Sequence, residues 1–233
     1  MFFEADFWMA LVTIIAIDLV LAGDNAVVIA LASRNLPKEQ RNKAILWGTF
    51  GAIIIRILMT IGAVWLLKIP YLQAIGGLLL LYVAVKLLKN EDETENIKAE
   101  ASLMQAIKTI IVADLIMGVD NVLAIAGASH GNIWLVIFGL VISVPIVVWG
   151  SKWITSMMDR YPIIIYVGAV ILAWTSGTMI VHDRKVGEFL GDMSWVSWVV
   201  HALTIGIVLL FGWLQNKSKK PTEQFDSENT NVV

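Results

Sequence analysis

Six polar residues form two copies of one acidic pattern, and each copy lies inside a long apolar segment. The copies are Asp18, Asp24 and Asn25, and Asp114, Asp120 and Asn121. An ionised carboxylate inside a membrane costs roughly 2.5–3.5 kcal/mol on insertion scales, so such residues usually serve ions, protons or substrates. Carboxylate and amide oxygens suit hard divalent cations, namely Mg²⁺, Ca²⁺ and Mn²⁺. We therefore expect these six residues to bind a divalent metal ion.

The other metal-binding and charged residues of the chain limit which metal ions the site could bind. The chain has no cysteine, and none of its three histidines lies in either copy. Zinc and copper therefore fit less well, because they prefer nitrogen or sulfur ligands. Arg56 lies in the middle of another apolar segment and is expected to balance the charge of one of the acids. Clustered like charges favour protonation, so metal entry is expected to release protons from the four aspartates.

Helix geometry suggests how the acids are oriented. Asp18 and Asn25 are seven residues apart, which returns to nearly the same helix face, whereas Asp24 lies about 120° away. A glycine accompanies the acids in each copy, Gly23 in the first and Gly118 in the second. Glycine permits local unwinding. We expect a discontinuous helix at both copies that turns the acids toward the centre of the protein.

The two copies are parts of a longer repeat. Residues 9–33, shifted by 96 positions, align with residues 105–129, and 12 of the 25 positions are identical. Shared apolar composition would produce scattered matches of Ile, Leu, Val and Ala. It would not also align both aspartates and the asparagine of each copy. The sequence therefore indicates an internal duplication.

The segments around the acids have the composition of a membrane protein. The 233-residue chain is 58% hydrophobic and only 15% charged, whereas an average soluble protein is about a quarter charged. Seven apolar segments are each expected to cross the membrane. The first follows an N-terminus without the basic region of a signal peptide, so we expect it to be retained. The segments are 7–33, 44–67, 71–88, 103–129, 133–151, 162–181 and 194–214.

Basic residues indicate the orientation of these segments. Most lysines and arginines follow the first, third, fifth and seventh segments or precede the next, and few lie on the opposite side. Because basic residues remain in the cytoplasm, the N-terminus is expected outside and the C-terminus inside.

The predicted fold is an all-α membrane protein with seven transmembrane helices. Three crossings separate the two acidic copies, so the duplication becomes an inverted repeat of 3+3 helices with one C-terminal helix added. We expect one transmembrane domain over 1–214, with repeats at about 7–88 and 103–181, and a disordered cytoplasmic tail over 215–233. Inverted repeats are typical of secondary transporters, whose binding site lies near the midplane between the repeats.

The motifs DLVLAGDN at 18–25 and DLIMGVDN at 114–121 resemble those of the TerC family of bacterial membrane proteins. The opening DLVLAGDNAVVIALASRNLP is most similar to the YjbE-type subgroup, and the resemblance covers about residues 7–214. It implies a seven-helix fold related to the LysE transporter superfamily, in the bacterial cytoplasmic membrane. It also implies Mn²⁺ efflux, the function associated with several members. The six motif residues match the family without departure.

Other functions remain open at this point. The chain could hand metal to secreted enzymes or to the secretion machinery, which would need the same ion site. The polar residues could instead hold the helices together by hydrogen bonds. An intramembrane aspartyl protease is disfavoured, because the glycine spacing and the Pro-Ala-Leu element of such enzymes are missing. We expect no enzyme, no cofactor and no nucleic-acid partner. Expected partners are the lipid bilayer, a metal ion, protons and further copies of the chain. Small residues such as Gly76 and Gly77 are expected to mediate close helix contacts, either within the bundle or between copies.

Overall fold

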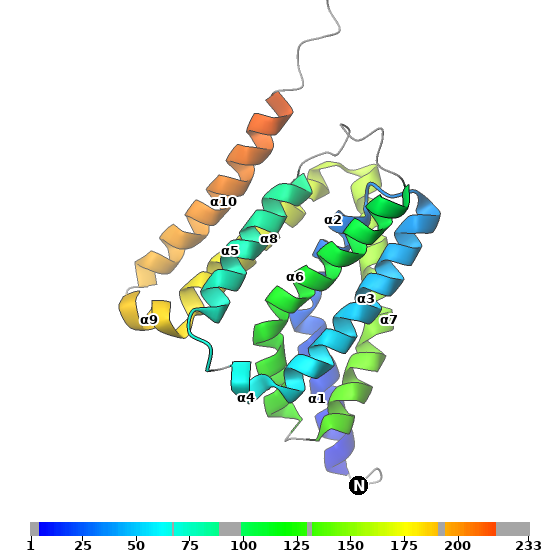
Figure 1. Cartoon of the computed structure of the whole chain (residues 1–233), viewed down its shortest axis with the longest axis vertical. Helices are drawn as coiled ribbons and strands as arrows, with labels where there is room; N and C mark the ends of the chain where they lie inside the picture. Colours follow the sequence, from blue (N-terminus) through cyan, green and yellow to red (C-terminus); the bar gives the residue numbers. More distant parts are fainter. Residues whose placement is uncertain (1–4, 67, 89–98, 130–131, 191–193, 218–233) are drawn as a thin grey trace, which may run out of the picture.

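A computed structural model describes residues 5–66, 68–88, 99–129, 132–190 and 194–217. Within these ranges every regular element is a helix (Figure 1). The helices are α1 (Ala5–Leu21), α2 (Gly23–Ser33), α3 (Lys38–Ile61), α4 (Ala63–Leu66), α5 (Leu72–Leu88), α6 (Ala99–Ala128), α7 (Ile133–Arg160), α8 (Ile163–His182), α9 (Arg184–Leu190) and α10 (Ser194–Lys217). Prolines mark several of the starts: Pro37 directly precedes α3 and Pro162 directly precedes α8. Proline has no N–H and disfavours a helical residue before it, so the chain turns there.

In the part of the chain that the structure describes, five helices are long and apolar enough to span a membrane, and α1 with α2 forms a sixth candidate if the bent pair is one span. The prediction of an all-helical membrane fold is therefore confirmed. Helix α5 is also apolar but has only 17 residues, which rise about 26 Å against a hydrocarbon core of about 30 Å. The count of seven spans thus stays a prediction.

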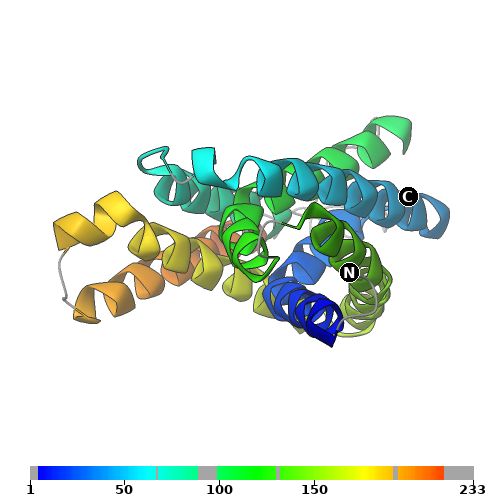
Figure 2. The ribbon, with the colours of Figure 1, turned by 90° about the horizontal axis from the view of Figure 1, so that it is seen from below.

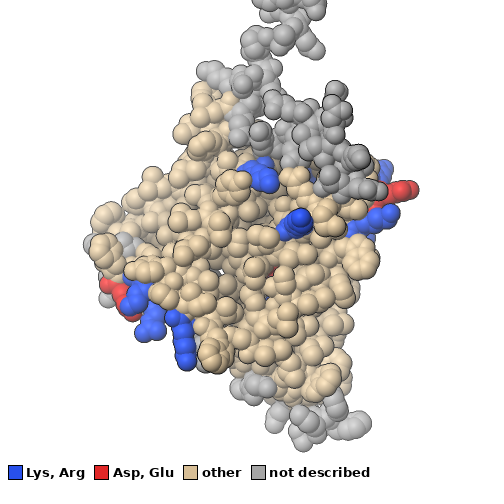
Figure 3. Space-filling model, viewed as in Figure 1, with Lys and Arg blue, Asp and Glu red and all other residues tan. Residues whose placement is uncertain are grey.

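The outer surface agrees with a lipid environment. Large apolar side chains are exposed along the helices, among them Trp47, Leu58, Trp149 and Leu203. On the face shown in Figure 3, most charged side chains lie in two groups, one at the lower left and one across the upper part and right edge, with a broad and mostly uncharged zone between them. A surface of this kind would be unfavourable in water and is stabilised by lipid.

The helices pack in pairs. Helix α3 lies along α6, α7 lies along both α1 and α2, and α5 lies along α8. Helix α10 packs on α8 and α5 at the edge of the bundle (Figures 1 and 2). Helix α6 runs in the direction opposite to α1 and α2 (Figure 1). The interior that results is built from aliphatic side chains such as Ile14, Leu80 and Leu172, which are fully buried.

One close contact occurs twice in this packing. A Cβ at Gly48 of α3 would overlap Ile110 of α6, and a Cβ at Gly139 of α7 would overlap Ile14 of α1. Ile14 and Ile110 are themselves 96 positions apart, the spacing of the sequence repeat. Helices α3 and α7 therefore approach equivalent positions of the two motif helices, each through a glycine.

The structure corrects several expectations about individual segments. The segment predicted as 7–33 is two helices that meet at a bend of 49°, as expected for the first motif. The second motif lies in α6, which continues unbroken through Gly118, so the expected break there is wrong. Helix α10 extends to Lys217, past the predicted start of a disordered tail at 215. The rest of that predicted tail, 218–233, lies outside the described residues.

The short helices α4 and α9 were not predicted.

The patch at Gly76 and Gly77 packs α5 within the bundle: a Cβ at Gly76 would lie 3.0 Å from Met179, and one at Gly77 would lie 2.7 Å from the Ser176 carbonyl oxygen of α8.

Candidate metal-ion site

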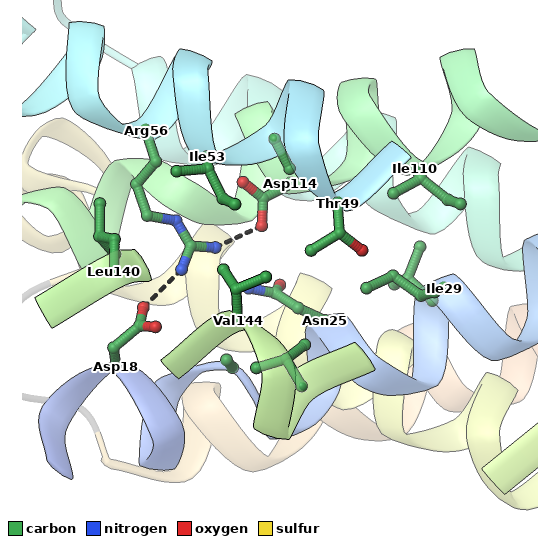
Figure 4. A pocket seen from close by; sticks show the side chains of 14 residues that line it. Asp18, Asn25, Ile29, Thr49, Ile53, Arg56, Ile110, Asp114, Leu140 and Val144 are labelled. Carbon is green, nitrogen blue, oxygen red and sulfur yellow. Dashed lines mark hydrogen bonds and ion pairs between the residues drawn. The ribbon is translucent and has the colours of Figure 1, made fainter. Parts of the chain in front are cut away.

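A buried arginine joins the two acidic motifs (Figure 4). The Nη1 atom of Arg56 lies 2.5 Å from Oδ1 of Asp18, and its Nη2 atom donates to Oδ1 of Asp114. Asp18 and Asp114 are the first acids of the two motifs, so the guanidinium bridges equivalent positions. The three residues are between 2% and 7% exposed. The prediction that Arg56 balances one acid is therefore too narrow, because it pairs with two.

The bridge depends on the depth of each residue in its helix. Arg56 and Asp114 lie inside α3 and α6, and Asp18 lies in the last turn of α1, near the middle of the bent α1–α2 span. Charges at this depth need partners, and a buried ion pair that loses one partner typically costs 3–5 kcal/mol. The cluster therefore joins three helices that are distant in the sequence.

A serine that the sequence reasoning missed completes the surroundings of Asp18. The hydroxyl of Ser143, on α7, has Oδ2 of Asp18 and the carbonyl oxygen of Leu140 as acceptors within hydrogen-bond distance and shares its one proton between them. Ser143 is fully buried and lies two residues before Pro145, which is inside the helix. A polar residue beside a proline in an apolar segment was the available signal.

A cavity adjoins the bridge and contains oxygen atoms without protein partners. The volume of the cavity, including the space that opens to solvent, is ≈ 470 Å³. Residues of α1, α2, α3, α6 and α7 line it. Neither side-chain polar atom of Asn25 makes a hydrogen bond, and the same holds for Thr49 Oγ1 and Asp114 Oδ2. Buried polar atoms are normally hydrogen-bonded, so unpaired ones call for an explanation. These three residues line the cavity together with Asp18 and Arg56.

The second acid of the first motif lies elsewhere. Asp24, at the start of α2, accepts a hydrogen bond of 3.3 Å from Thr175 of α8 and one of 2.9 Å from the backbone N–H of Asn25. It does not line the cavity. The bend between α1 and α2 therefore does not turn both acids toward one centre, as the sequence reasoning expected.

The rest of the second motif is less completely described. Asn121 is buried, and its Nδ2 atom has no hydrogen-bond partner. The side chain of Asp120 lies outside the described residues.

The two motif glycines also differ. A Cβ at Gly23 would meet nothing within 4 Å, whereas one at Gly118 would lie 2.8 Å from Met59 Cε. Gly118 therefore contacts only the flexible end of a side chain of α3, and α6 does not unwind there.

The chemistry available at the cavity is that of hard oxygen donors. Asp18 and Asp114 supply carboxylates, and Asn25 and Thr49 add neutral oxygens. Among the side chains that the structure describes, no group of three or more His, Cys, Asp or Glu residues could hold a metal ion. Among the described side chains the cavity therefore offers two acids with amide and hydroxyl oxygens, while Asp24 lies elsewhere and the Asp120 side chain is outside the described residues.

Fold and site together define the class of this protein. Helices long and apolar enough to cross a membrane several times surround a buried cluster of charges, with apolar side chains outside. The chain is therefore a multi-pass integral membrane protein.

The chain belongs to the TerC family, because the family described as "Integral membrane protein TerC family" matches residues 3–220. It is 49% identical over 207 residues to the uncharacterized membrane protein YjbE of Bacillus subtilis (strain 168), covering 89% of this chain and 95% of YjbE. The uncharacterized membrane protein YkoY of the same organism is 24% identical, with 96% and 76% covered. The inner membrane protein YgdQ of Escherichia coli (strain K12) is 25% identical, with 77% and 83% covered. No solved structure matches the chain significantly.

Proposed function

We propose that this protein exports divalent metal ions, Mn²⁺ foremost, from the bacterial cytoplasm. One observation carries the proposal: equivalent acids of the two motifs, Asp18 and Asp114, face a common buried cavity that also holds unpaired oxygen atoms of Asn25 and Thr49. Intramembrane acids beside a polar cavity usually serve ions or protons. The donor set suits Mn²⁺, Ca²⁺ or Mg²⁺, and the resemblance to the TerC family favours Mn²⁺.

The finer architecture belongs to the same proposal. Seven spans would form an inverted repeat of three helices each with α10 added, a plan shared with the LysE superfamily, and the N-terminus would lie outside. The antiparallel course of α6 relative to α1 and α2 supports this plan (Figure 1). So does the repeated glycine contact of α3 and α7 with equivalent isoleucines. The inner membrane location in the name of YgdQ supports a cytoplasmic membrane.

The six motif residues would then act at successive depths. Asp18, Asp114 and Asn25 would bind the ion beside the cavity. Asp24 lies six residues beyond Asp18 toward one end of the bundle, and Asp120 lies six residues beyond Asp114 toward the other. A straight helix rises about 9 Å over six residues. Asp24 and Asp120 would thus lie on opposite sides of the central acids, along the route of the ion, with Asn121 beside Asp120.

Proton exchange follows from the same charges. Even with Arg56 paired to two of them, the four carboxylates leave an excess of negative charge when no metal ion is bound. This excess would favour bound protons, and metal entry would release them. We propose Mn²⁺/H⁺ exchange, with the protein acting as a transporter and not as an enzyme. An imposed pH gradient should change the rate of Mn²⁺ uptake by proteoliposomes, and equal rates with and without the gradient would contradict the coupling.

The direct test is Mn²⁺ uptake by proteoliposomes that contain purified protein. Asp18→Asn and Asp114→Asn should each lower the initial rate at least tenfold, because each removes a charge that the ion needs. Asp159→Asn is the matched control, since Asp159 is exposed and pairs with Arg41 at 2.6 Å; its rate should stay within twofold of wild type. Unchanged uptake in both cavity variants, with the proteins folded, would contradict the proposed site.

A further inference from the structure

The guanidinium of Arg56 lies where two opposed carboxylates would bind a cation. It contacts one oxygen of Asp18 and one of Asp114, the equivalent acids of the two motifs. In Figure 4 the guanidinium lies between these two side chains, which come from opposite sides. A metal ion bound by both acids would need the same space. Arg56 therefore fills the position of an ion with its own positive charge.

Charge balance points the same way. Asp18, Asp114 and Arg56 together carry one net negative charge when all are ionised, whereas the two acids alone carry two. A divalent cation is matched by the two acids alone, and Arg56 left beside them would oppose its binding. In a buried site, where charges are poorly screened, the ion and the guanidinium would compete for the same carboxylates.

The cavity lies on one side of this bridge. Its other lining residues include Ile29 of α2, Thr49 of α3, Ile110 of α6 and Val147 of α7. Each is displaced from the bridge toward the end of the bundle where α2 and α7 end and α3 and α6 begin, the upper end in Figure 1. Under the proposed orientation this is the cytoplasmic end. Arg56 thus closes the cavity on the side away from the cytoplasm.

The side chain also has atoms that the bridge does not use. Arg56 Nε and Asp114 Oδ2 are buried without hydrogen-bond partners, while the other oxygen of Asp18 is held by Ser143. The bridge therefore leaves part of the bonding capacity of Arg56 and Asp114 unused. A second arrangement, with the guanidinium displaced and both acids facing the cavity, would use the free oxygen of Asp114.

We infer that Arg56 is a tethered cation that replaces the metal ion in the empty transporter. The ion binds only when Arg56 leaves Asp18 and Asp114, and Arg56 returns to them when the ion is released. The positive charge of Arg56 then allows the empty site to close and reset without a bound metal. This inference rests on the proposed function and adds a role for Arg56 to it.

A variant without the charge of Arg56 should retain the exchange of Mn²⁺ for Mn²⁺ and lose net Mn²⁺ uptake. Arg56→Gln should bind Mn²⁺ at least tenfold more tightly than wild type, because its competitor is absent. It should still exchange radiolabelled Mn²⁺ for Mn²⁺ inside preloaded vesicles, since exchange needs no empty state. Net uptake into Mn²⁺-free vesicles should fall at least tenfold, because the empty site cannot reset.

Two further variants complete the experiment. Arg56→Lys keeps the positive charge and should retain net uptake within about threefold of wild type. Arg160→Gln, which removes an exposed arginine at the end of α7, is the matched control and should change neither binding nor transport. Size-exclusion profiles and thermal unfolding in detergent would show whether each variant is folded.

Several results would overturn the inference. A folded Arg56→Gln variant that binds Mn²⁺ no more tightly than wild type, or that retains net uptake, would do so. If Arg56→Gln does not fold, equal losses of exchange and net uptake in Arg56→Lys would indicate a purely structural bridge. A wild-type protein that neither binds nor exchanges Mn²⁺ would contradict the proposed function, and the inference would fall with it.

Discussion

At the scale of single residues, the site combines side chains that are fully paired with others that are not. Asp18 has both oxygens occupied, one by Arg56 and one by Ser143. Asn25 and Thr49 are equally buried, yet their side-chain oxygens have no partner. An unpaired buried polar group typically costs 1–3 kcal/mol. Such a cost at the cavity is understandable if these oxygens bind the transported ion.

Thr49 allows this explanation to be tested with little change in shape. Thr49→Val removes only the hydroxyl, which has no protein partner, so thermal stability should be unchanged or slightly higher. Mn²⁺ affinity should fall about tenfold, measured by calorimetric titration in detergent, because one ion ligand is lost. Thr155→Val is the matched control: the Thr155 hydroxyl is buried but bonds the backbone oxygen of Ser151. Equal Mn²⁺ affinities in wild type and Thr49→Val would exclude Thr49 as a ligand.

At the scale of helices, glycines allow α3 and α7 to pack closely against the helices that carry the motifs. Gly48 and Gly139 leave room for Ile110 and Ile14, which are equivalent residues of the two motif helices. These contacts hold α3 against α6 and α7 against α1, and so position Arg56 and Ser143 near the acids. Most of the binding geometry therefore depends on helix packing around the site.

Gly139→Ala should destabilise the protein, because the added Cβ overlaps Ile14. Overpacking of a core typically costs 1–3 kcal/mol, so the midpoint of thermal unfolding in detergent should fall by several degrees. Gly150→Ala, on the same helix, adds a methyl group that meets nothing within 4 Å. It should leave the midpoint unchanged or raise it, since alanine favours helix. Similar midpoints for the two variants would argue against tight packing at Gly139.

At the scale of the whole molecule, the charged ends and the apolar zone between them determine how the bundle lies in the membrane (Figure 3). One end carries the Arg41–Asp159 ion pair, and the other carries α9 with Arg184, Lys185 and Glu188. Under the proposed orientation the first of these ends, with its excess of basic residues, lies in the cytoplasm.

Single cysteines can test this orientation, because the chain has none of its own. Arg184→Cys, on α9, should react with a membrane-impermeant maleimide in intact cells. Arg160→Cys, at the end of α7, should react only after the cells are permeabilised. Labelling measured by gel shift would compare the two. The reverse pattern would invert the proposed topology and, with it, the assignment of the cavity to the cytoplasmic side.

The sequence by itself determined the features that depend on local composition. Apolar segments predict membrane helices because burial in lipid depends on each segment's own hydropathy. The repeat of Asp18 at Asp114 indicated paired acids, and the isolated charge of Arg56 indicated a buried partner. The bend before Asp24 was also anticipated.

Only the tertiary structure decided which of these groups meet. The direction in which a side chain points depends on the rotation of its helix and on packing between segments far apart in the chain. That packing brings Asp18, Asp114 and Arg56 together, and directs Asp24 to Thr175 instead. In the same structure α6 is unbroken at Gly118. Thr49 and Ser143 join the site only through this packing, because the sequence around a hydroxyl in an apolar segment does not show which residue it will contact, even where a proline lies nearby as it does for Ser143.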